Sequence, residues 1–316
     1  MTLRKLSRKI LRKILTSGPV KSGVAYSKRV ALPGFDNMPL YDVADFFFTG
    51  IQKGSIVTRA QSLAFSFFLA TFPAIIFSFS LIAYIPIKGF QESLIRLLLE
   101  TLPQDAKDWT RETIVDIVRI QRGGLLSLGF LLALYFTTNG FMTMMRGFNS
   151  SYHILETRPP WKQRLVALVL TLLLSTLVII ATTLIIFSEV ATKFLVAKHI
   201  LKSNTQVVLL LLGKWTVVLA LFLIAISFLY YYAPAIRKRW RFISAGSTFA
   251  TIGTIVVSTG FAYFVNHFGQ YNKVYGSIGT IIVMMIWFYF NALVLILGFE
   301  LNASIENAKR QVKRVF

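Results

Sequence analysis

The chain has 316 residues, of which 55% are hydrophobic and only 15% are charged, and its mean hydropathy is +0.64. Soluble domains carry about a quarter charged residues, so this composition excludes the soluble and disordered classes and favours a polytopic membrane protein. The 34 Lys and Arg residues outnumber the 13 Asp and Glu residues, and the resulting net charge of +21 must lie outside the hydrocarbon. Cysteine is absent, which excludes disulfides, thiolate nucleophiles and Cys-ligated zinc.

Residues 1–40 form a basic amphipathic segment. Its basic residues recur at helical spacing, at Arg4, Lys5, Arg8, Lys9, Arg12 and Lys13. Its apolar residues gather on the opposite face of the same helix, at Leu3, Leu6, Ile10 and Ile14. We expect this helix to bind anionic inner-leaflet lipids, at about 1 kcal/mol per basic residue. A nucleic-acid arm and an organelle transit peptide are the alternatives, but no aromatic residue interleaves the charges before Tyr26, so no nucleic-acid partner is expected.

Six continuous apolar segments follow, each long enough to cross the hydrocarbon as a helix, which takes about 20 residues. They lie at about 60–84, 124–147, 164–186, 207–232, 242–264 and 277–299. A membrane-spanning barrel would alternate apolar and polar residues at period two, and these runs do not. The predicted fold is therefore all-α, with a six-transmembrane helix bundle in a membrane domain over 41–305 and a basic cytoplasmic tail over 306–316.

Two segments outside the spans also show helical patterns. Segment 41–54 carries three consecutive phenylalanines ahead of Gly50 and Gly54, and it predicts an interfacial elbow that leads into the first span. The connection over 85–123 contains two stretches of helical apolar spacing, and Pro103 suits the first turn of the second stretch. We expect this insert to form a small helical cap outside the membrane.

The distribution of basic residues predicts the orientation of the chain. An even number of spans places both termini on one side, and that side holds 23 of the 34 Lys and Arg residues. The opposite side holds 10 of them, and Lys214 lies within a span. Because basic residues concentrate in cytoplasmic loops, we expect both termini in the cytoplasm and the insert over 85–123 in the periplasm.

Two features inside the spans bear on packing. Pro73 lies midway along span one, where a proline removes a backbone hydrogen bond and kinks the helix unless neighbours satisfy the freed carbonyl. Such a bend either improves packing or lines a cavity. Span five carries small residues at Gly246, Ala250, Gly253 and Gly260, which predict close approach of another helix. That helix belongs either to the same chain or to a neighbouring subunit of a homo-oligomer.

Polar residues at membrane depth are the candidate functional residues, because they are costly in lipid. Arg59, Arg146 and Glu300 fall at the cytoplasmic ends of spans one, two and six, so all three could meet at one depth. The alternative is that the two arginines reach outward to lipid phosphates. Asn139 and Asn291 lie deeper, where an amide either links two helices or contacts a substrate.

The catalytic motifs of common enzymes do not occur in the sequence. The three histidines, His153, His199 and His267, are scattered over different connections or span ends. The sequence has no HExxH motif, no phosphate-binding GxxxxGK[ST] loop and no GxSxG nucleophile elbow. We therefore expect no metal, no cofactor and no enzymatic activity.

Three stretches carry a pattern more specific than hydropathy. The first runs from Arg59-Ala60-Gln61-Ser62-Leu63-Ala64-Phe65-Ser66-Phe67 to Phe72-Pro73. The second is Tyr230-Tyr231-Tyr232-Ala233-Pro234, followed by Trp240-Arg241 and Ala245-Gly246. The third is Phe268-Gly269-Gln270-Tyr271-Asn272-Lys273-Val274-Tyr275-Gly276-Ser277-Ile278-Gly279, which continues through Trp287 and Tyr289 to Gly298-Phe299-Glu300-Leu301-Asn302. Over about residues 40–305 the chain resembles the YihY/BrkB family of inner-membrane proteins.

The resemblance implies a bacterial inner-membrane protein with six spans. Members of that family have carried the name ribonuclease BN, now regarded as a misassignment; others are linked to serum resistance and, for one relative, to movement of a lipid A precursor. Where the family has a small, Ala-rich start to span one, this chain has Gln61-Ser62 and phenylalanines beyond, which argues against close packing there.

The leading hypothesis is a transporter or flippase for a lipid or another amphipathic anionic substrate. In this hypothesis Arg59 and Arg146 hold a phosphate, and Glu300 and Asn302 set the gate. The residues Asn139, Asn291, Tyr271 and Tyr275 complete the predicted substrate contacts, with the last two shaping the outer mouth. The alternatives are a non-catalytic scaffold for envelope machinery and, least favoured, a ribonuclease.

Overall fold

The computed structural model describes residues 25–53, 55–86, 89–101, 111–112, 114–116, 118–152, 155–198, 204–235, 242–267 and 277–315. Its helices are α3 (Leu40–Lys53), α4 (Ile56–Ile82), α5 (Phe90–Thr101), α7 (Gly123–Ser151), α8 (Pro160–Ala197), α9 (Asn204–Tyr232), α10 (Ala245–His267) and α12 (Ser277–Val315). Within the described ranges six helices, α4, α7, α8, α9, α10 and α12, are long and apolar enough to cross a membrane, and no strand occurs. The all-α polytopic prediction is confirmed. The amphipathic helix expected at the N-terminus lies outside the described residues.

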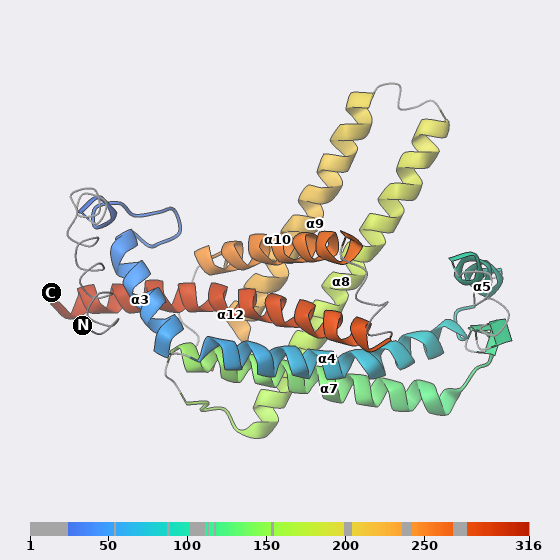
Figure 1. Cartoon of the computed structure of the whole chain (residues 1–316), viewed down its shortest axis with the longest axis horizontal. Coiled ribbons are helices and arrows are strands. Elements are labelled where there is room, and N and C mark those ends of the chain that lie inside the picture. The colour runs from blue at the N-terminus through green and yellow to red at the C-terminus, as the bar shows by residue number, and fades with distance from the viewer. Residues whose placement is uncertain are drawn as a thin grey trace, which may run out of the picture.

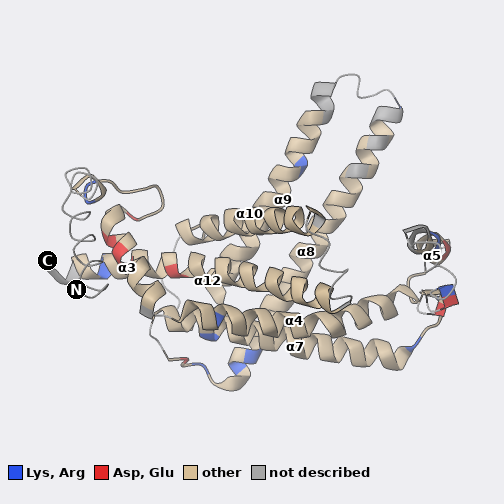
Figure 2. Ribbon diagram, in the orientation of Figure 1, with Lys and Arg blue, Asp and Glu red and all other residues tan. Residues whose placement is uncertain are grey.

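Four of the six spans form a bundle (Figure 1). Helices α4 and α7 run side by side, α12 packs on α4, and α10 packs on α12. Helix α3 and the C-terminal end of α12 lie at one end of this bundle, and α5 lies at the other. Charged residues gather near these two ends, and the middle of the bundle carries few (Figure 2). This separation fits spans that place their ends in water and their centres in hydrocarbon.

Helices α8 and α9 pack on each other as a hairpin that runs obliquely to the other four spans (Figure 1). The candidate span within α8 covers Pro160–Thr192, 33 residues, and its ends carry Lys162, Arg164 and Glu189, whereas the sequence predicted a span over 164–186. At 1.5 Å per residue the apolar run between Arg164 and Glu189 is about 36 Å long, against about 30 Å of hydrocarbon. A tilt accommodates this difference.

Helix α12 is also longer than the sequence indicated. It continues without a break to Val315, through residues that we expected to form a separate tail over 306–316. Its last turns are amphipathic: Ile305 and Ala308 are buried against Phe35 and Val43, and Lys309 pairs with Asp36 at 2.9 Å. This packing against α3 and the preceding loop explains why the helix continues.

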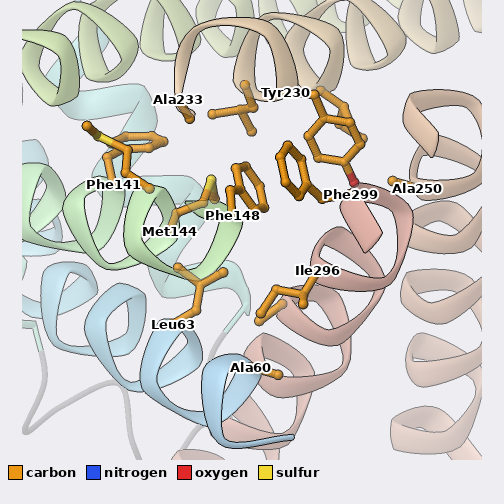
Figure 3. Packing of buried hydrophobic residues seen from close by; sticks show 14 of the residues in the cluster. Ala60, Leu63, Phe141, Met144, Phe148, Tyr230, Ala233, Ala250, Ile296 and Phe299 are labelled. Atoms are coloured by element: carbon orange, nitrogen blue, oxygen red, sulfur yellow. The ribbon is translucent and has the colours of Figure 1, made fainter. Parts of the chain in front are cut away.

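The core lies between α4, α7, α9 and α12, and its aromatic centre joins the last three of these helices (Figure 3). The Phe148 and Phe299 rings stack at 4.1 Å between centroids, and the Tyr230 ring packs edge-on against both. The Tyr230 hydroxyl donates a 2.6 Å hydrogen bond to the Leu295 carbonyl, which satisfies its only polar atom inside the core. Phe148 and Phe299 are fully buried, so this cluster fixes the three helices relative to one another.

Small residues bring two pairs of spans into close contact. On α10, a Cβ added at Gly246 would overlap the Gly298 carbonyl of α12, and one added at Gly253 would lie 2.7 Å from Val294. The small-residue prediction is therefore confirmed there, with a helix of the same chain as the partner. Gly260 instead faces open space. Close packing occurs also between α4 and α7, contrary to expectation, because glycines of α7 approach phenylalanines of α4: a Cβ at Gly129 would lie 3.0 Å from the Phe77 nitrogen.

The two segments outside the spans contain the helices that the sequence predicted. The elbow over 41–54 falls in α3, and the insert over 85–123 contains α5 together with helical residues at 111–112, 114–116 and 118–119. The Gln121 side chain donates to the Ala83 carbonyl at 3.1 Å, which ties the insert to the end of α4. Pro73 is buried, and α4 continues past it to Ile82.

Candidate functional site

A groove of about 430 Å³ lies between α4 and α7, toward the α3 end of the bundle. From α4 it is lined by Thr58, Arg59, Ser62, Phe65 and Ser66, and from α7 by Thr143, Arg146, Gly147 and Ser150. The polar positions repeat every three or four residues on each helix, so each helix turns one polar stripe toward the same space. Two guanidinium groups and five hydroxyls therefore surround one cavity on the side of a membrane bundle.

Arg59 is the buried arginine of this groove, with only 9% of its side chain exposed. Its Nη1 donates to the Gly147 carbonyl at 2.8 Å and to the Ser151 hydroxyl at 2.7 Å. Its Nη2 donates to Oε2 of Glu300 at 3.2 Å, and its Nε is buried without a hydrogen-bond partner. The alternative, that Arg59 reaches outward to lipid phosphates, is therefore wrong, because Arg59 forms an ion pair inside the bundle.

The Arg59–Glu300 ion pair uses one N–H of the guanidinium edge formed by Nε and Nη2. The contrast is Arg158, whose Nε and Nη2 both bond the Glu156 carboxylate, at 2.7 and 2.9 Å. Such two-point contacts are the strongest that arginine makes with carboxylate or phosphate. On Arg59 the Nε of this edge is buried and has no partner, so its contact with Glu300 is a single hydrogen bond.

Glu300 sits at a junction of three helices. It lies on α12, it is 5% exposed, and its Oε2 accepts the hydrogen bond from Arg59 of α4. Gly50 of α3 packs directly on its carboxyl group: a Cβ added at Gly50 would lie 3.0 Å from Cδ of Glu300 and closer still to Oε1. A side chain at this position would displace the carboxylate. The sequence marked Gly50 only as part of an elbow.

Arg146 occupies the open side of the groove. It is exposed, and no hydrogen bond or ion pair joins it to the part of the chain that the structure describes. The sequence placed Arg59, Arg146 and Glu300 at one depth. The structure brings the two arginines into one cavity and Glu300 behind Arg59, outside the groove lining.

The two deep asparagines link helices. Asn139 of α7 accepts a 3.1 Å hydrogen bond from Arg164 of α8, whose guanidinium also lies 5.2 Å from the centre of the Tyr135 ring. Asn291 of α12 donates to the Trp287 carbonyl at 2.9 Å within its own helix, and it accepts from Ser258 of α10 at 3.4 Å. Asn291 also borders an apolar cavity of about 220 Å³ between α8, α9, α10 and α12.

Asn302 caps a helix. Its Oδ1 accepts a 2.8 Å hydrogen bond from the Gly246 backbone N–H, and its Nδ2 donates to the Ser244 hydroxyl at 2.7 Å. These groups lie at the start of α10, where the first backbone N–H groups have no partner within the helix. The predicted gate residue therefore holds the end of α10 on α12. Tyr271 and Tyr275, the other predicted contacts, lie outside the described residues.

A second polar cluster joins two loops, and sequence reasoning missed it. Asn149 donates to Glu156 at 2.7 Å and accepts from the Ala235 N–H at 2.8 Å. Arg158 bonds Glu156 and donates to the Ala233 carbonyl at 2.8 Å. Burial would raise the pKa of Glu156, but the Arg158 hydrogen bonds and charge outweigh it, and the pKa is lowered. This loop clamp fastens the turn after α7 to the turn after α9.

The fold and the groove together define a class of protein. It is an α-helical, multi-pass membrane protein with a basic groove open to the side of its bundle. Among the described residues no group of three or more His, Asp or Glu side chains is placed to hold a metal ion. The chain belongs to the BrkB family, because the family model described as "Virulence factor BrkB" matches residues 47–315.

Individual relatives extend over most of the chain. The ribonuclease-like protein YfkH of Bacillus subtilis is 33% identical over 257 residues, which cover 80% of this chain and 91% of that protein. A UPF0761 membrane protein of Alteromonas mediterranea is 24% identical over 277 residues, 85% of this chain and 89% of the relative. One from Tolumonas auensis is 39% identical over 80 residues, about a quarter of each chain. The ribonuclease-like name is a mislabel for this family. No solved structure matches the chain significantly.

Proposed function

We propose that the protein moves an anionic amphipathic lipid across the bacterial inner membrane, and that the groove between α4 and α7 holds its phosphate. The observation that carries this proposal is the pair of arginines that line one cavity, Arg146 on its open side and Arg59 held in place by its buried ion pair. Two guanidinium groups and several hydroxyls are the donors that a phosphodiester oxygen requires.

The groove also suits the remainder of a lipid. It opens on the lipid-facing side of α4 and α7, where Phe65 is 53% exposed beside Arg59 and Ser66. An acyl chain can therefore stay in the surrounding hydrocarbon while the headgroup enters the groove. A fully enclosed site would have to take in the apolar chains as well.

A polar stripe continues from the groove toward the membrane centre. Asn139, Thr143, Arg146 and Ser150 lie on one face of α7, at intervals of four, three and four residues. From Ser150 to Asn139 the stripe runs about 16 Å, roughly half of the hydrocarbon thickness. It offers a headgroup polar partners at depths where lipid offers none.

The proposal includes the expected orientation of the chain in the membrane and its expected contacts with lipid. Both termini lie in the cytoplasm, so the groove is on the inner-leaflet side, and the basic N-terminal segment contacts anionic inner-leaflet lipids. A scaffold without transport is the competing hypothesis, and a bundle filled beside Arg59 would have favoured it. The cavity at Arg59 supports transport instead.

Flux measurements on reconstituted protein test the proposal. We expect full-length protein in vesicles to accelerate the exchange of fluorescent phosphatidylglycerol between leaflets, followed by dithionite quenching. Arg146→Ala should slow this exchange at least tenfold, and since Arg146 is exposed its removal should leave the fold intact. Arg119→Ala, which removes an exposed arginine of the outer insert, is the matched control and should behave as wild type. Exchange at the rate of empty vesicles would refute the proposal.

A further inference from the structure

The apolar cavity of about 220 Å³ separates the hairpin of α8 and α9 from α10 and α12. Helix α8 packs closely on α7 and α9, and within the described residues it makes no comparable contact with α10 or α12. A space therefore remains beside α8 that no other helix fills. It shares no lining residue with the groove between α4 and α7, so it is a separate site.

This cavity lies at the depth of the hydrocarbon. Leu174 and Val178 are near the middle of the candidate span of α8, and Phe222 is near the middle of that of α9. No charged residue is present in the described lining. The medium that reaches the cavity from outside the protein is therefore the interior of the bilayer.

Water is a poor occupant of the cavity. Thr254 and Asn291 are the only polar residues in its described lining, and the Asn291 amide is already hydrogen-bonded to Trp287 and Ser258. The Thr254 hydroxyl is buried within the protein, so it gives the cavity little polar surface. A buried water needs about two to four polar partners, and apolar cavities stay dry.

The cavity joins the lipid-facing surface to the core of the protein. Among its lining residues Val178 is 63% exposed and Phe222 is 43% exposed, so these two mark the rim. Ile226 and Leu229 mark the inner wall, because both are buried and belong to the central core. If the cavity were empty, its wall would lose packing contacts that hydrocarbon entering from the rim can supply.

We infer that this cavity binds the end of one lipid acyl chain, which fills the space between the hairpin and α12. An apolar cavity of about 150 Å³ holds a benzene molecule, so about 220 Å³ is enough for the last carbons of an acyl chain. Since no charged group lines the site, it selects the apolar chain and not the headgroup. The bound chain packs on both sides of the cavity and supports the hairpin against the other spans. This inference does not depend on the proposed function.

Photocrosslinking in vesicles tests the site. The full-length protein is reconstituted with phosphatidylethanolamine that carries a diazirine near the end of one acyl chain, and the labelled residues are mapped by mass spectrometry after illumination. Bulk lipid should label exposed residues such as Ile179 and Val256. Label on Ile226 and Leu229 requires a chain inside the cavity, because both side chains are buried. We expect these two to be labelled, and equally so when the same chain is carried by phosphatidylglycerol or phosphatidylcholine.

Filling the cavity should abolish this label. Ala225 lines the cavity from α9, so the ring of Ala225→Phe should occupy the space, and Ile226 and Leu229 should lose their label while exposed residues keep theirs. Ala262→Phe is the matched control, because Ala262 is exposed on α10, and it should give the wild-type pattern. Ala181→Leu fills the same cavity from α8 and provides the test if Ala225→Phe does not fold.

The outcomes are distinct from those of the exchange assay. Wild type labelled at exposed residues alone would refute a chain inside the cavity, whatever the variants do. Label on Ile226 and Leu229 that survives in both filled variants would also overturn the site. Labelling by one headgroup class alone would overturn the assignment of recognition to the chain. Each of these results leaves the groove between α4 and α7 to be judged by lipid exchange.

Discussion

Replacing Gly50 by alanine should disturb the buried ion pair without removing either charge. The added Cβ would lie 3.0 Å from Cδ of Glu300 and 3.3 Å from Cγ, where unstrained carbon contacts are about 3.5–4.0 Å. The carboxylate must therefore move away from α3, and a shift of about 1 Å would break its 3.2 Å hydrogen bond to Arg59. Loss of a hydrogen bond between charged groups costs about 1.5–3 kcal/mol.

A helix-propensity gain opposes this loss. Alanine is better than glycine inside a helix by about 1 kcal/mol, so the net destabilisation should be about 0.5–2 kcal/mol. Equilibrium unfolding in mixed micelles, followed by circular dichroism, measures it. In a Glu300→Ala background the obstacle is gone, and Gly50→Ala should instead stabilise the protein by up to about 1 kcal/mol.

The reversal of sign is the decisive result. Gly213→Ala is the matched control, because nothing lies within 4 Å of its added Cβ, and it should stabilise both backgrounds equally. If Gly50→Ala had the same effect with and without the Glu300 carboxylate, the argument that α3 positions this carboxylate would be refuted.

Three further predictions concern the helix contacts and the loop clamp. Gly246→Ala should prevent stable folding or cost more than about 3 kcal/mol, since its Cβ would overlap a backbone carbonyl of α12, whereas Gly260→Ala should fold normally in the same unfolding assay. Asn302→Ala should cost about 0.5–2 kcal/mol through loss of the α10 cap, and an undiminished unfolding free energy would contradict that role. The pKa of Glu156 is lowered from its ordinary value of 4.5, so its carboxylate stabilises the fold fully above pH 4.5, and this stabilisation is lost as the pH falls further. Glu156→Gln should therefore flatten the acid limb of a curve of unfolding free energy against pH.

The number and type of the spans could be predicted because each is a long, uninterrupted apolar run. Their ends could not. Helix α12 continues past its apolar run because its next turns pack on α3 and on the loop before it. This packing depends on neighbours that the local sequence does not show.

The candidate site was predicted in part, for a similar reason. Arg59 and Glu300 share a depth that the sequence reveals, yet they are 241 positions apart, and only the packing of α4 on α12 makes them a pair. In the sequence Asn302 is as polar as a residue that contacts a substrate would be. Its role as a helix cap depends on where α10 begins. The loop clamp could not be predicted, because nothing in the sequence marks Asn149, Glu156 and Arg158 as members of one cluster.

The oblique hairpin of α8 and α9 gives the protein a sensitivity to bilayer thickness. The apolar rod of α8 between Arg164 and Glu189 is about 36 Å long, somewhat longer than the hydrocarbon at about 30 Å, so α8 must tilt to keep both charged ends in water. In a thinner bilayer the same rod must lie flatter, and in a thicker one it can stand closer to the other four spans. The length of the lipid chains would therefore set the angle between the hairpin and the other four spans. The same angle sets the space that is open to lipids between the hairpin and these spans.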